Sequence, residues 1–158
     1  MINKEAIGKS LGKIPSGVGI LTTIHQKQDA AMLASWFQQV AFEPPMVSVA
    51  VQKDRAIHQT LSQAKSFCLN LLHTNQKEIF AHFVRGFEPG LNPFEGISIQ
   101  RKVTGAGVLK DAMSYLDCEI VSSTEAGDHI IYFAKVVDGD VLQEGHSMIH
   151  LRRNGFSY

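Results

Sequence analysis

The chain has 158 residues, of which 44% are hydrophobic and 19% charged, and its 15 lysines and arginines balance its 15 aspartates and glutamates. Proteins that bind nucleic acids or membrane surfaces usually carry a surplus of basic residues, so a net charge of zero argues against both kinds of partner. The length fits one domain over residues 1–158, which is large enough to bury a core without disulfide bonds.

The two cysteines, Cys68 and Cys118, each lie singly within an apolar run. Such isolation is typical of small core residues and argues against a disulfide framework or a thiolate metal site. The N-terminal stretch mixes charged and small residues and lacks the apolar segment of a signal peptide. No apolar run approaches the roughly 18 residues that a membrane span requires. We therefore expect a cytoplasmic protein.

The first predicted element is a helix over residues 3–14, whose apolar residues recur at helical spacing until Pro15 ends it. Strands are predicted next, at 17–24, 31–42 and 46–52. A polar turn over 25–29 separates the first two, and two prolines separate the second from the third. The close spacing of these strands favours a meander.

Two further helices are predicted from capping residues. Asp54 is a good N-cap and precedes a run with apolar residues at helical spacing, which predicts a helix over 55–64. Asn75 and Glu78 have the spacing of a capping box and predict a helix over 76–86. The remaining predicted strands and the closing segment cover residues 66–73, 97–103, 115–124, 129–141 and 148–158.

The predicted elements amount to six to eight short strands and two or three short helices. Because the strands are consecutive and do not alternate with helices, the order argues against a doubly wound parallel sheet. It favours a mainly β fold, a closed or nearly closed antiparallel barrel with flanking helices.

Most motifs that would carry chemistry are missing. Seven histidines suggest a metal site, but no two have ligand spacing on a predicted helix with a glutamate between them. His146 and His150 are four residues apart across a turn and a strand, where that spacing does not converge. Neither the hydrolase motif G-x-S-x-G nor the phosphate-binding motifs G-x-G-x-x-G and G-x-x-x-x-G-K occurs. We expect no metal site.

One cluster of charge could hold an anion. Lys53 and Arg55 flank Asp54 at the start of a predicted helix, where unpaired N–H groups and the positive end of the helix dipole suit a phosphate. On spacing alone the stronger alternative is that Asp54 caps the helix and both cations are solvated. A second ambiguous run is Ala34-Ser35 beside Trp36. It fits either the close approach of backbone to a planar ring or a strand with one large core residue.

Seven runs occur in an order that carries a family resemblance: IPSGVGILTT (14–23), AMLASWFQQVAFEPPMVSVAV (31–51), KDRAIHQTL (53–61), FCLNLL (67–72), YLDCEIV (115–121), GDHIIYFAKV (127–136) and NGFSY (154–158). Together they resemble the flavin reductase-like family of FMN-binding split barrels. The chain is most similar to the flavin reductase module at the C-terminus of cyanobacterial-type flavodiiron, or diflavin, proteins.

The resemblance implies a homodimer of six-stranded antiparallel Greek-key barrels, each binding FMN, or alternatively FAD, near the subunit interface. It implies an NAD(P)H:flavin oxidoreductase, in which hydride passes from nicotinamide to flavin N5 and electrons continue to an acceptor, which could be a protein. One alternative is an FMN-binding electron-transfer module without nicotinamide activity. Another is a related split barrel that binds pyridoxal phosphate or haem.

The resemblance also assigns flavin-binding roles by position, to Met32, Leu33, Ala34, Ser35, Trp36, Lys53, Asp54, Arg55, Asn70 and Tyr158. The first five would line the polar edge of the isoalloxazine ring, where backbone donors tune its potential. The run 53–55 would hold the phosphate. Asn70 could contact the site or make a structural hydrogen bond.

One position is assigned to the reaction itself, and the role of Tyr158 at the flavin can be stated further. His129 lies in the family's Gly-Asp-His motif, which is associated with the nicotinamide or flavin face, and is the predicted catalytic residue. Tyr158 could stack on the flavin ring or cover it. The bulky Trp36, where many free-standing reductases have a small residue, favours FMN held as a prosthetic group.

Overall fold

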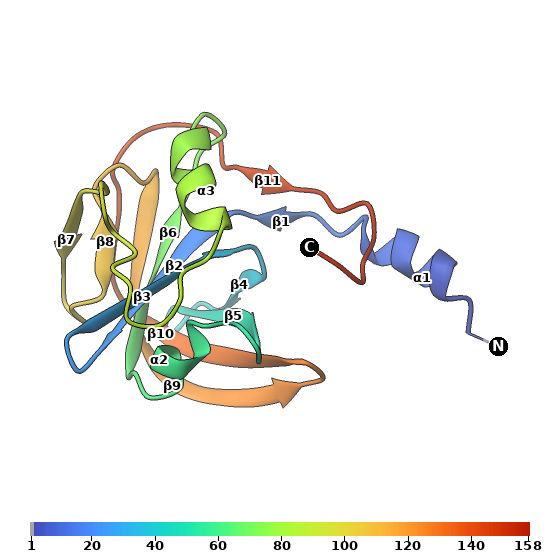
Figure 1. Cartoon of the computed structure of the whole chain (residues 1–158), viewed down its shortest axis with the longest axis horizontal. Coiled ribbons are helices and arrows are strands. Elements are labelled where there is room, and N and C mark those ends of the chain that lie inside the picture. Colours follow the sequence, from blue (N-terminus) through green and yellow to red (C-terminus); the bar gives the residue numbers. More distant parts are fainter. Residues whose placement is uncertain (1) are drawn as a thin grey trace.

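The computed structural model describes residues 2–158, with Met1 outside it, and seven strands form one antiparallel sheet that curls around a core (Figure 1). These strands are β2 (Gly19–His25), β3 (Gln28–Ala34), β4 (Phe37–Ala41), β5 (Met46–Gln52), β6 (Ser66–Leu71), β9 (Ser114–Ala126) and β10 (His129–Val141). Their order is β3-β2-β6-β9-β10-β5-β4, so β3 and β4 are the edges. Because β3 and β4 are consecutive in the chain, the two edges meet, and the barrel is split between them. The predicted mainly β class is confirmed.

The sheet has seven strands where the resemblance predicts six, because the predicted strand over 31–42 is in fact two strands. The chain breaks at Ser35 and Trp36, after which it pairs with β5 in place of β2. The backbone oxygen of Trp36 accepts a hydrogen bond from the Ala50 N–H at 2.8 Å, which fixes this change of partner. Neither glycine nor proline marks the break within the largely apolar run 31–42, so the sequence gives no sign of it.

The turn between β2 and β3 is tighter than the predicted turn over 25–29. It consists of Gln26 and Lys27 alone, whose φ angles of 47° and 65° are both left-handed. Two left-handed residues are the requirement of a two-residue hairpin whose twist matches that of its strands. The long β2–β3 hairpin carries β3 to the edge of the sheet.

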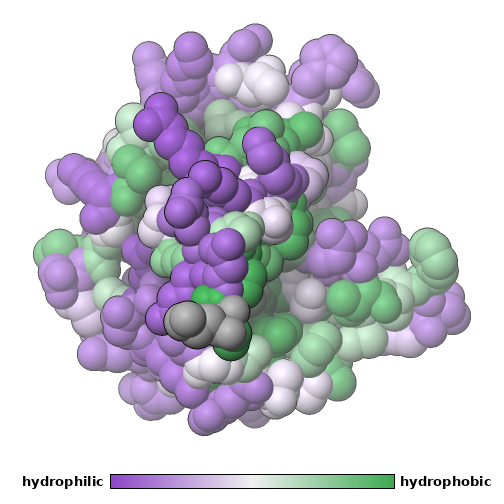
Figure 2. All heavy atoms as spheres, turned by 90° about the vertical axis from the view of Figure 1, so that its right-hand side faces the viewer, coloured by the Kyte–Doolittle hydropathy of each residue, from purple (hydrophilic) through white to green (hydrophobic). Residues whose placement is uncertain are grey.

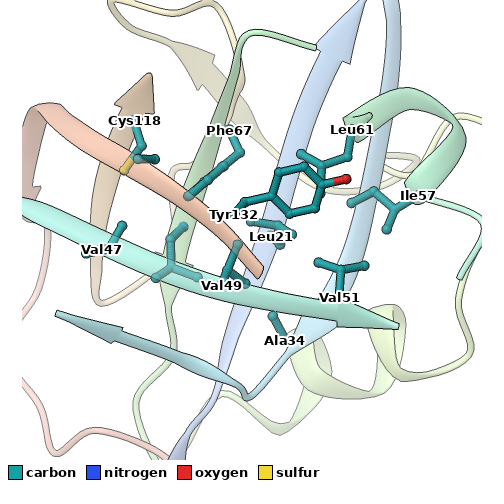
Figure 3. Packing of buried hydrophobic residues seen from close by; sticks show 12 residues of the cluster. Leu21, Ala34, Val47, Val49, Val51, Ile57, Leu61, Phe67, Cys118 and Tyr132 are labelled. Atoms are coloured by element: carbon teal, nitrogen blue, oxygen red, sulfur yellow. The ribbon is translucent and has the colours of Figure 1, made fainter. Parts of the chain in front are cut away.

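The barrel core is built from strands with a two-residue period. In β5, Val47, Val49 and Val51 are buried and alternate with half-buried neighbours. Figure 3 shows these valines in one cluster with Phe67 of β6 and with Tyr132 of β10, the cross-strand partner of Val49. Burial of such side chains contributes about 1.5–3 kcal/mol each, which makes this cluster the main source of stability.

A buried amide ties a small additional sheet to the barrel. This sheet consists of β7 (Ile99–Arg101) and β8 (Gly107–Leu109), of which β8 is not predicted from the sequence. The Asn70 side chain is fully buried; it donates to the backbone oxygens of Ile20 and Gly107 at 3.2 Å and accepts from the Leu109 N–H at 2.8 Å. Asn70 therefore has the structural role that the sequence leaves open.

Helix α2 (His58–Leu61) is shorter than the predicted helix over 55–64, and Asp54 does not cap it. Its N-cap is Ile57, which points into the barrel core and makes no side-chain cap. Backbone hydrogen bonds between residues three apart take the chain through tight turns over 52–58 before the helix begins. The predicted helix N-terminus at the charged cluster is therefore wrong.

Helix α3 (Lys77–Val84) forms where a helix is predicted, but the capping box between Asn75 and Glu78 does not. The N-cap is Gln76, whose side-chain oxygen accepts the backbone N–H of His73 at 2.9 Å. The apolar side of α3 packs on a second core cluster next to β3.

The two ends of the chain form an arm that projects from the barrel (Figure 1). We use this name for residues 2–17, with helix α1 (Lys4–Leu11) and β1 (Ser16–Gly17), together with residues 148–158, with β11 (Ile149–His150). β1 pairs with β11, and the Gly155 N–H donates to the Gly8 oxygen at 2.8 Å. Green apolar surface lies among hydrophilic side chains on the arm's end of the molecule (Figure 2).

Both cysteines lie in the barrel as unpaired, buried residues. Burial raises the pKa of the Cys118 thiol to about 12 and that of Cys68 well above its ordinary value. Both thiols therefore stay protonated and pack as small core residues. In the described part of the chain, no helix is long and apolar enough to cross a membrane.

Candidate functional site

Three cavities meet where the split of the barrel faces the arm. The first, which we call the strand cavity, has a volume of about 300 Å³ and is lined by Val18, Met32, Leu33, Ala34, Ser35, Trp36, Ala50, Arg55, Phe80, Phe83, Val84, Gly86, His150 and Tyr158. The structure thus brings together the five predicted residues of the 32–36 run with Arg55 and Tyr158. Predicted site residues that are far apart in sequence share one wall.

The second cavity, the loop cavity, continues from the first and measures about 770 Å³. It lies between β3, the turns after β5 and the loop 85–91, and shares Met32, Arg55 and Gly86 with the strand cavity. The third, the tail cavity, measures about 350 Å³ and is lined by Trp36, Gln52, Asp128, His129, Arg152, Gly155, Phe156, Ser157 and Tyr158. Trp36 and Tyr158 form the wall between the strand and tail cavities.

The strand cavity takes its shape from the position of β3 at the edge of the sheet. β3 pairs only with β2, so alternate backbone N–H and C=O groups on its other side have no strand partner. Beyond β3, Phe80, Phe83 and Val84 of α3 close the cavity with apolar side chains. The result is a slot with apolar walls and a polar backbone edge, which suits a flat heteroaromatic ring.

The charged run 53–55 divides between this site and the surface. Arg55 lies at the junction of the strand and loop cavities, with its guanidinium 5.2 Å from the centre of the Tyr158 ring. Asp54 lines the loop cavity. Lys53 lines none of the three cavities, and its ammonium pairs with Glu125 at 3.0 Å on the surface. Arg55 is therefore the member of the run placed to meet an anionic group.

Next to the strand cavity, three aromatic rings form a packed cluster. The ring of His129 stacks on Trp36 with centroids 4.7 Å apart and planes 26° apart. Its Nε2 lies 2.7 Å from the Tyr158 hydroxyl, and its Nδ1 lies 2.6 Å from Oδ1 of Asp128. The guanidinium of Arg152 lies 5.0 Å from the centre of the Trp36 ring. His129 is 7% exposed, so the arm covers the predicted catalytic residue.

The pKa directions of Asp128 and Tyr158 indicate which atoms of this cluster donate hydrogen bonds. The hydrogen bond from His129 lowers the pKa of Asp128, while burial raises the pKa of Tyr158. At neutral pH Asp128 is thus a carboxylate that accepts the Nδ1–H. In a neutral imidazole Nε2 then accepts the Tyr158 O–H. The cluster fixes the orientation of the His129 ring.

Asn70, like Lys53, is a predicted flavin ligand that lies outside the three cavities. Its amide lines none of the three cavities, and both ends of it bond to backbone groups inside the barrel. The alternation of β6 places the Asn70 side chain on the opposite face from Leu69 and Leu71. That face is turned toward β8 and not toward the three cavities.

Sequence reasoning also missed residues that line the cavities. Gln52 reaches the tail cavity because β5 pairs with β10, in a register that sets Gln52 opposite His129. His150 and Gly86 border the strand cavity. The apolar face of α3 is visible in the sequence as a helical pattern, but the pattern does not say that the face closes a cavity.

The family follows from a comparison with known proteins. The profile of the family described as "Flavin reductase like domain" matches residues 11–157, and the chain belongs to this family. Diflavin flavoprotein A 1 of Synechocystis sp. (strain PCC 6803) is 39% identical over 152 residues. That alignment covers 95% of this chain but 26% of the relative, so the chain spans about a quarter of the length of the curated relatives it matches.

Solved structures support the same assignment. The NADH:FAD oxidoreductase SgcE6 of Streptomyces globisporus C-1027 superposes with a TM-score of 0.82 and 27% identity, covering 89% of this chain and 84% of that protein. The flavin reductase HpaC has a TM-score of 0.80, with 94% of each chain covered, and at 24% identity it shows the shared fold. The oxidoreductase class that the resemblance predicts is the class of this family.

The residues of the site fit a flavin on their own chemistry. The strand cavity offers apolar walls for a ring, and the free edge of β3 offers donors for the polar side of that ring. The small side chains of Ala34 and Ser35 let a ring lie close to the backbone. Arg55 stands where the strand cavity opens into the loop cavity, as an anionic tail on such a ring requires.

Proposed function

We propose that this chain is an FMN-binding NAD(P)H:flavin oxidoreductase. The observation that carries the proposal is the strand cavity, in which the edge of β3, the run 32–36 and Arg55 surround one slot. Bound flavin would supply the chemistry, by accepting hydride at N5 from the C4 of a nicotinamide and passing electrons to an acceptor. The similarity to an NADH:FAD oxidoreductase supports a nicotinamide as the reductant.

The protein's own residues would bind and orient the two rings. The backbone of Met32, Leu33, Ala34 and Ser35 would hold the polar edge of the flavin, and Arg55 would pair with its phosphate. Asp128 would keep the His129 ring in one orientation at the face where the reductant arrives. No general base is needed, because positioning and exclusion of water suffice for this transfer.

The test is an anaerobic titration of the purified chain. We expect the chain to bind FMN and the oxidised flavin absorbance to bleach when NADH or NADPH is added. Parallel titrations with FMN and FAD measure which flavin binds more tightly. Tight flavin binding without bleaching by either nicotinamide would contradict the reductase activity while leaving the flavin site in place.

A second candidate is an FMN-binding electron-transfer module that takes electrons from a protein donor. The observation that favours it is the docked arm, since Tyr158 and Arg152 cover the Trp36 and His129 face that a nicotinamide would need. Such a module would be yellow when purified, inert to NADH and NADPH, and bleached by a reduced ferredoxin-type protein.

We also propose that the chain forms a homodimer through the arm. Ile14, Ile149, Leu151 and Phe156 are all more than half exposed on this one projection. Apolar side chains gathered on a projecting segment are typical of a surface that another chain covers. Sedimentation velocity should show a dimer that Leu151→Asp dissociates, whereas Val121→Asp, at an equally exposed valine on β9, leaves it intact. A monomeric parent protein would contradict the proposal.

The cytoplasmic location stays a prediction.

A further inference from the structure

Tyr158 separates two cavities that the proposed reaction requires to be joined. Together with Trp36, its ring forms the wall between the strand cavity and the tail cavity. Transfer between two bound rings needs reacting atoms about 3–3.5 Å apart. A ring in the strand cavity and a ring in the tail cavity cannot approach so closely while the Tyr158 ring stands between them.

Of the two residues in this wall, Trp36 is the fixed one. Its backbone oxygen bonds to Ala50 in the sheet at 2.8 Å, and its ring lies in contact with His129 and Arg152. The backbone bond anchors the residue in the sheet, and the stack on His129 orients its ring.

Tyr158 is held much more loosely. Its side chain is 51% exposed, and its contacts are the hydroxyl bond to His129, the guanidinium of Arg55 and a tilted stack on Trp36 with centroids 5.4 Å apart. Within residues 2–158, no hydrogen bond involves the backbone of Ser157 or Tyr158. Side-chain contacts alone keep the residue docked.

The docked arm also leaves a polar group without a partner. Arg152 lies over Trp36 and donates to the backbone oxygens of Gly155 and Leu11, but its Nε is buried with no hydrogen-bond partner among the described residues. An unsatisfied buried donor destabilises the arrangement that buries it. The unpaired Nε therefore offsets part of what the Arg152 contacts and the Gly155 N–H bond to Gly8 contribute to holding the segment 152–158 in place.

We propose that Tyr158 determines access to the site by occupying the place of the reductant's planar ring against Trp36 and His129. Docking of Tyr158 and binding of the reductant then exclude each other. This inference rests on the proposed function, because it assigns the nicotinamide ring to the tail cavity. It makes the arm a competitor that the reductant must displace before its ring can meet the flavin.

Removal of the competitor should strengthen reductant binding. When the open form is a minor fraction, the apparent affinity is reduced by that fraction, so Tyr158→Ala should lower the KM for the nicotinamide about three- to tenfold. Tyr158→Phe keeps the ring but loses the hydroxyl bond and should give a smaller decrease. Phe42→Ala removes an 88% exposed ring from the turn before β5 and should leave the KM unchanged.

A second measurement needs no turnover. Trp36 is the only tryptophan in the chain, so its fluorescence reports directly on the wall. In the full chain without flavin, acrylamide should quench Trp36 more strongly in Tyr158→Ala than in the parent protein or in Phe42→Ala. Addition of NAD+ should quench the same fluorescence at lower concentration in Tyr158→Ala. Far-ultraviolet circular dichroism verifies that each variant is folded.

The outcomes separate this inference from the function on which it rests. Flavin that bleaches with nicotinamide at the same KM in Tyr158→Ala and the parent protein overturns the role of Tyr158 and leaves the proposed function standing. Unchanged acrylamide quenching overturns the docked position itself. Flavin that binds but is bleached by neither nicotinamide in any variant overturns the proposed function, and the assignment of Tyr158 with it.

Discussion

In the barrel, Leu21, Val51, Leu61 and Phe67 are fully buried, whereas in the arm Ile14, Ile149, Leu151 and Phe156 are more than half exposed. Buried polar groups follow the same division. Inside the barrel every Asn70 amide group has a backbone partner, whereas in the arm Nε of Arg152 has no partner among the described residues.

This difference indicates that the barrel supplies the stable part of the candidate site, while the arm supplies the part that can move. The barrel is a well-packed framework, and it contributes the free strand edge of β3 to the site. The arm is weakly held, and it covers the aromatic cluster that borders the strand cavity. Segments with few buried contacts open at low free energy, so movement at the site should occur in the arm.

The largest expected effect is on the free energy of unfolding, and it is tested by two single asparagine variants, one in the barrel and one in the arm. Asn70→Ala leaves buried backbone groups of β2 and β8 unpaired and creates a cavity, so it should lower the free energy of unfolding by about 2–4 kcal/mol. Asn154→Ala in the arm removes one exposed bond to the Phe156 N–H and should cost less than about 1 kcal/mol. Urea unfolding measures both. Similar losses would erase the distinction between barrel and arm.

The second prediction concerns the two cations of the run 53–55. Arg55→Ala should weaken FMN binding at least about tenfold, which corresponds to about 1.4 kcal/mol, because Arg55 lies at the junction of two cavities. Lys53→Ala should change the affinity less than about twofold, since that ammonium pairs with Glu125 on the surface. Isothermal titration with FMN tests the pair. Equal losses would return Lys53 to the phosphate site.

A smaller effect is expected at the contact between the two halves of the arm. In Gly155→Ala the added Cβ would overlap the Cβ of Leu11, so the segment 152–158 should move away from α1. We expect stronger acrylamide quenching of Trp36 with a change of less than about 1 kcal/mol in barrel stability. Ser157→Ala, at an exposed neighbour, is the matched control. A large loss of stability would mean that the arm is part of the framework.

The barrel could be predicted from the sequence because its information is local. The alternation of β5 and the apolar face of α3 are visible in short windows. The break at Ser35 and Trp36 is not visible, because no glycine or proline marks it. The strand β8 has three residues and is held by an amide more than 30 residues away. Local patterns cannot report a partner that only the fold supplies.

The candidate site shows the same limit. The run 32–36, Arg55, His129 and Tyr158 come together as the resemblance implies, although their binding roles stay proposals. The sequence could not predict that Lys53 pairs with Glu125 while Arg55 lines the cavities, since Glu125 lies 72 residues away. Nor does composition indicate that Tyr158 would reach His129 across 29 residues and cover it.

The smallest expected effect concerns the carboxylate that orients His129. The hydrogen bond from His129 holds the pKa of Asp128 below its ordinary value of about 3.9, so the folded state favours the ionised form. A carboxyl whose pKa is lowered on folding contributes stability above its ordinary pKa, and that contribution is lost as the pH falls through the folded value. Because Asp128 is fully exposed, solvent screens the interaction and the contribution is small.

Asp128→Asn should therefore lower the urea midpoint slightly at pH 7 and by less at pH 3, because the parent carboxyl takes up a proton as the pH falls. The same variant should also slow nicotinamide-dependent bleaching, because the Asn amide oxygen accepts the His129 Nδ1–H less strongly than a carboxylate does and holds the ring less firmly. Asp140→Asn, at the far end of β10, is the matched control. A variant that lost stability equally at both pH values would show that Asp128 acts through packing, and the His129 ring would then owe its orientation to Trp36 and Tyr158 alone.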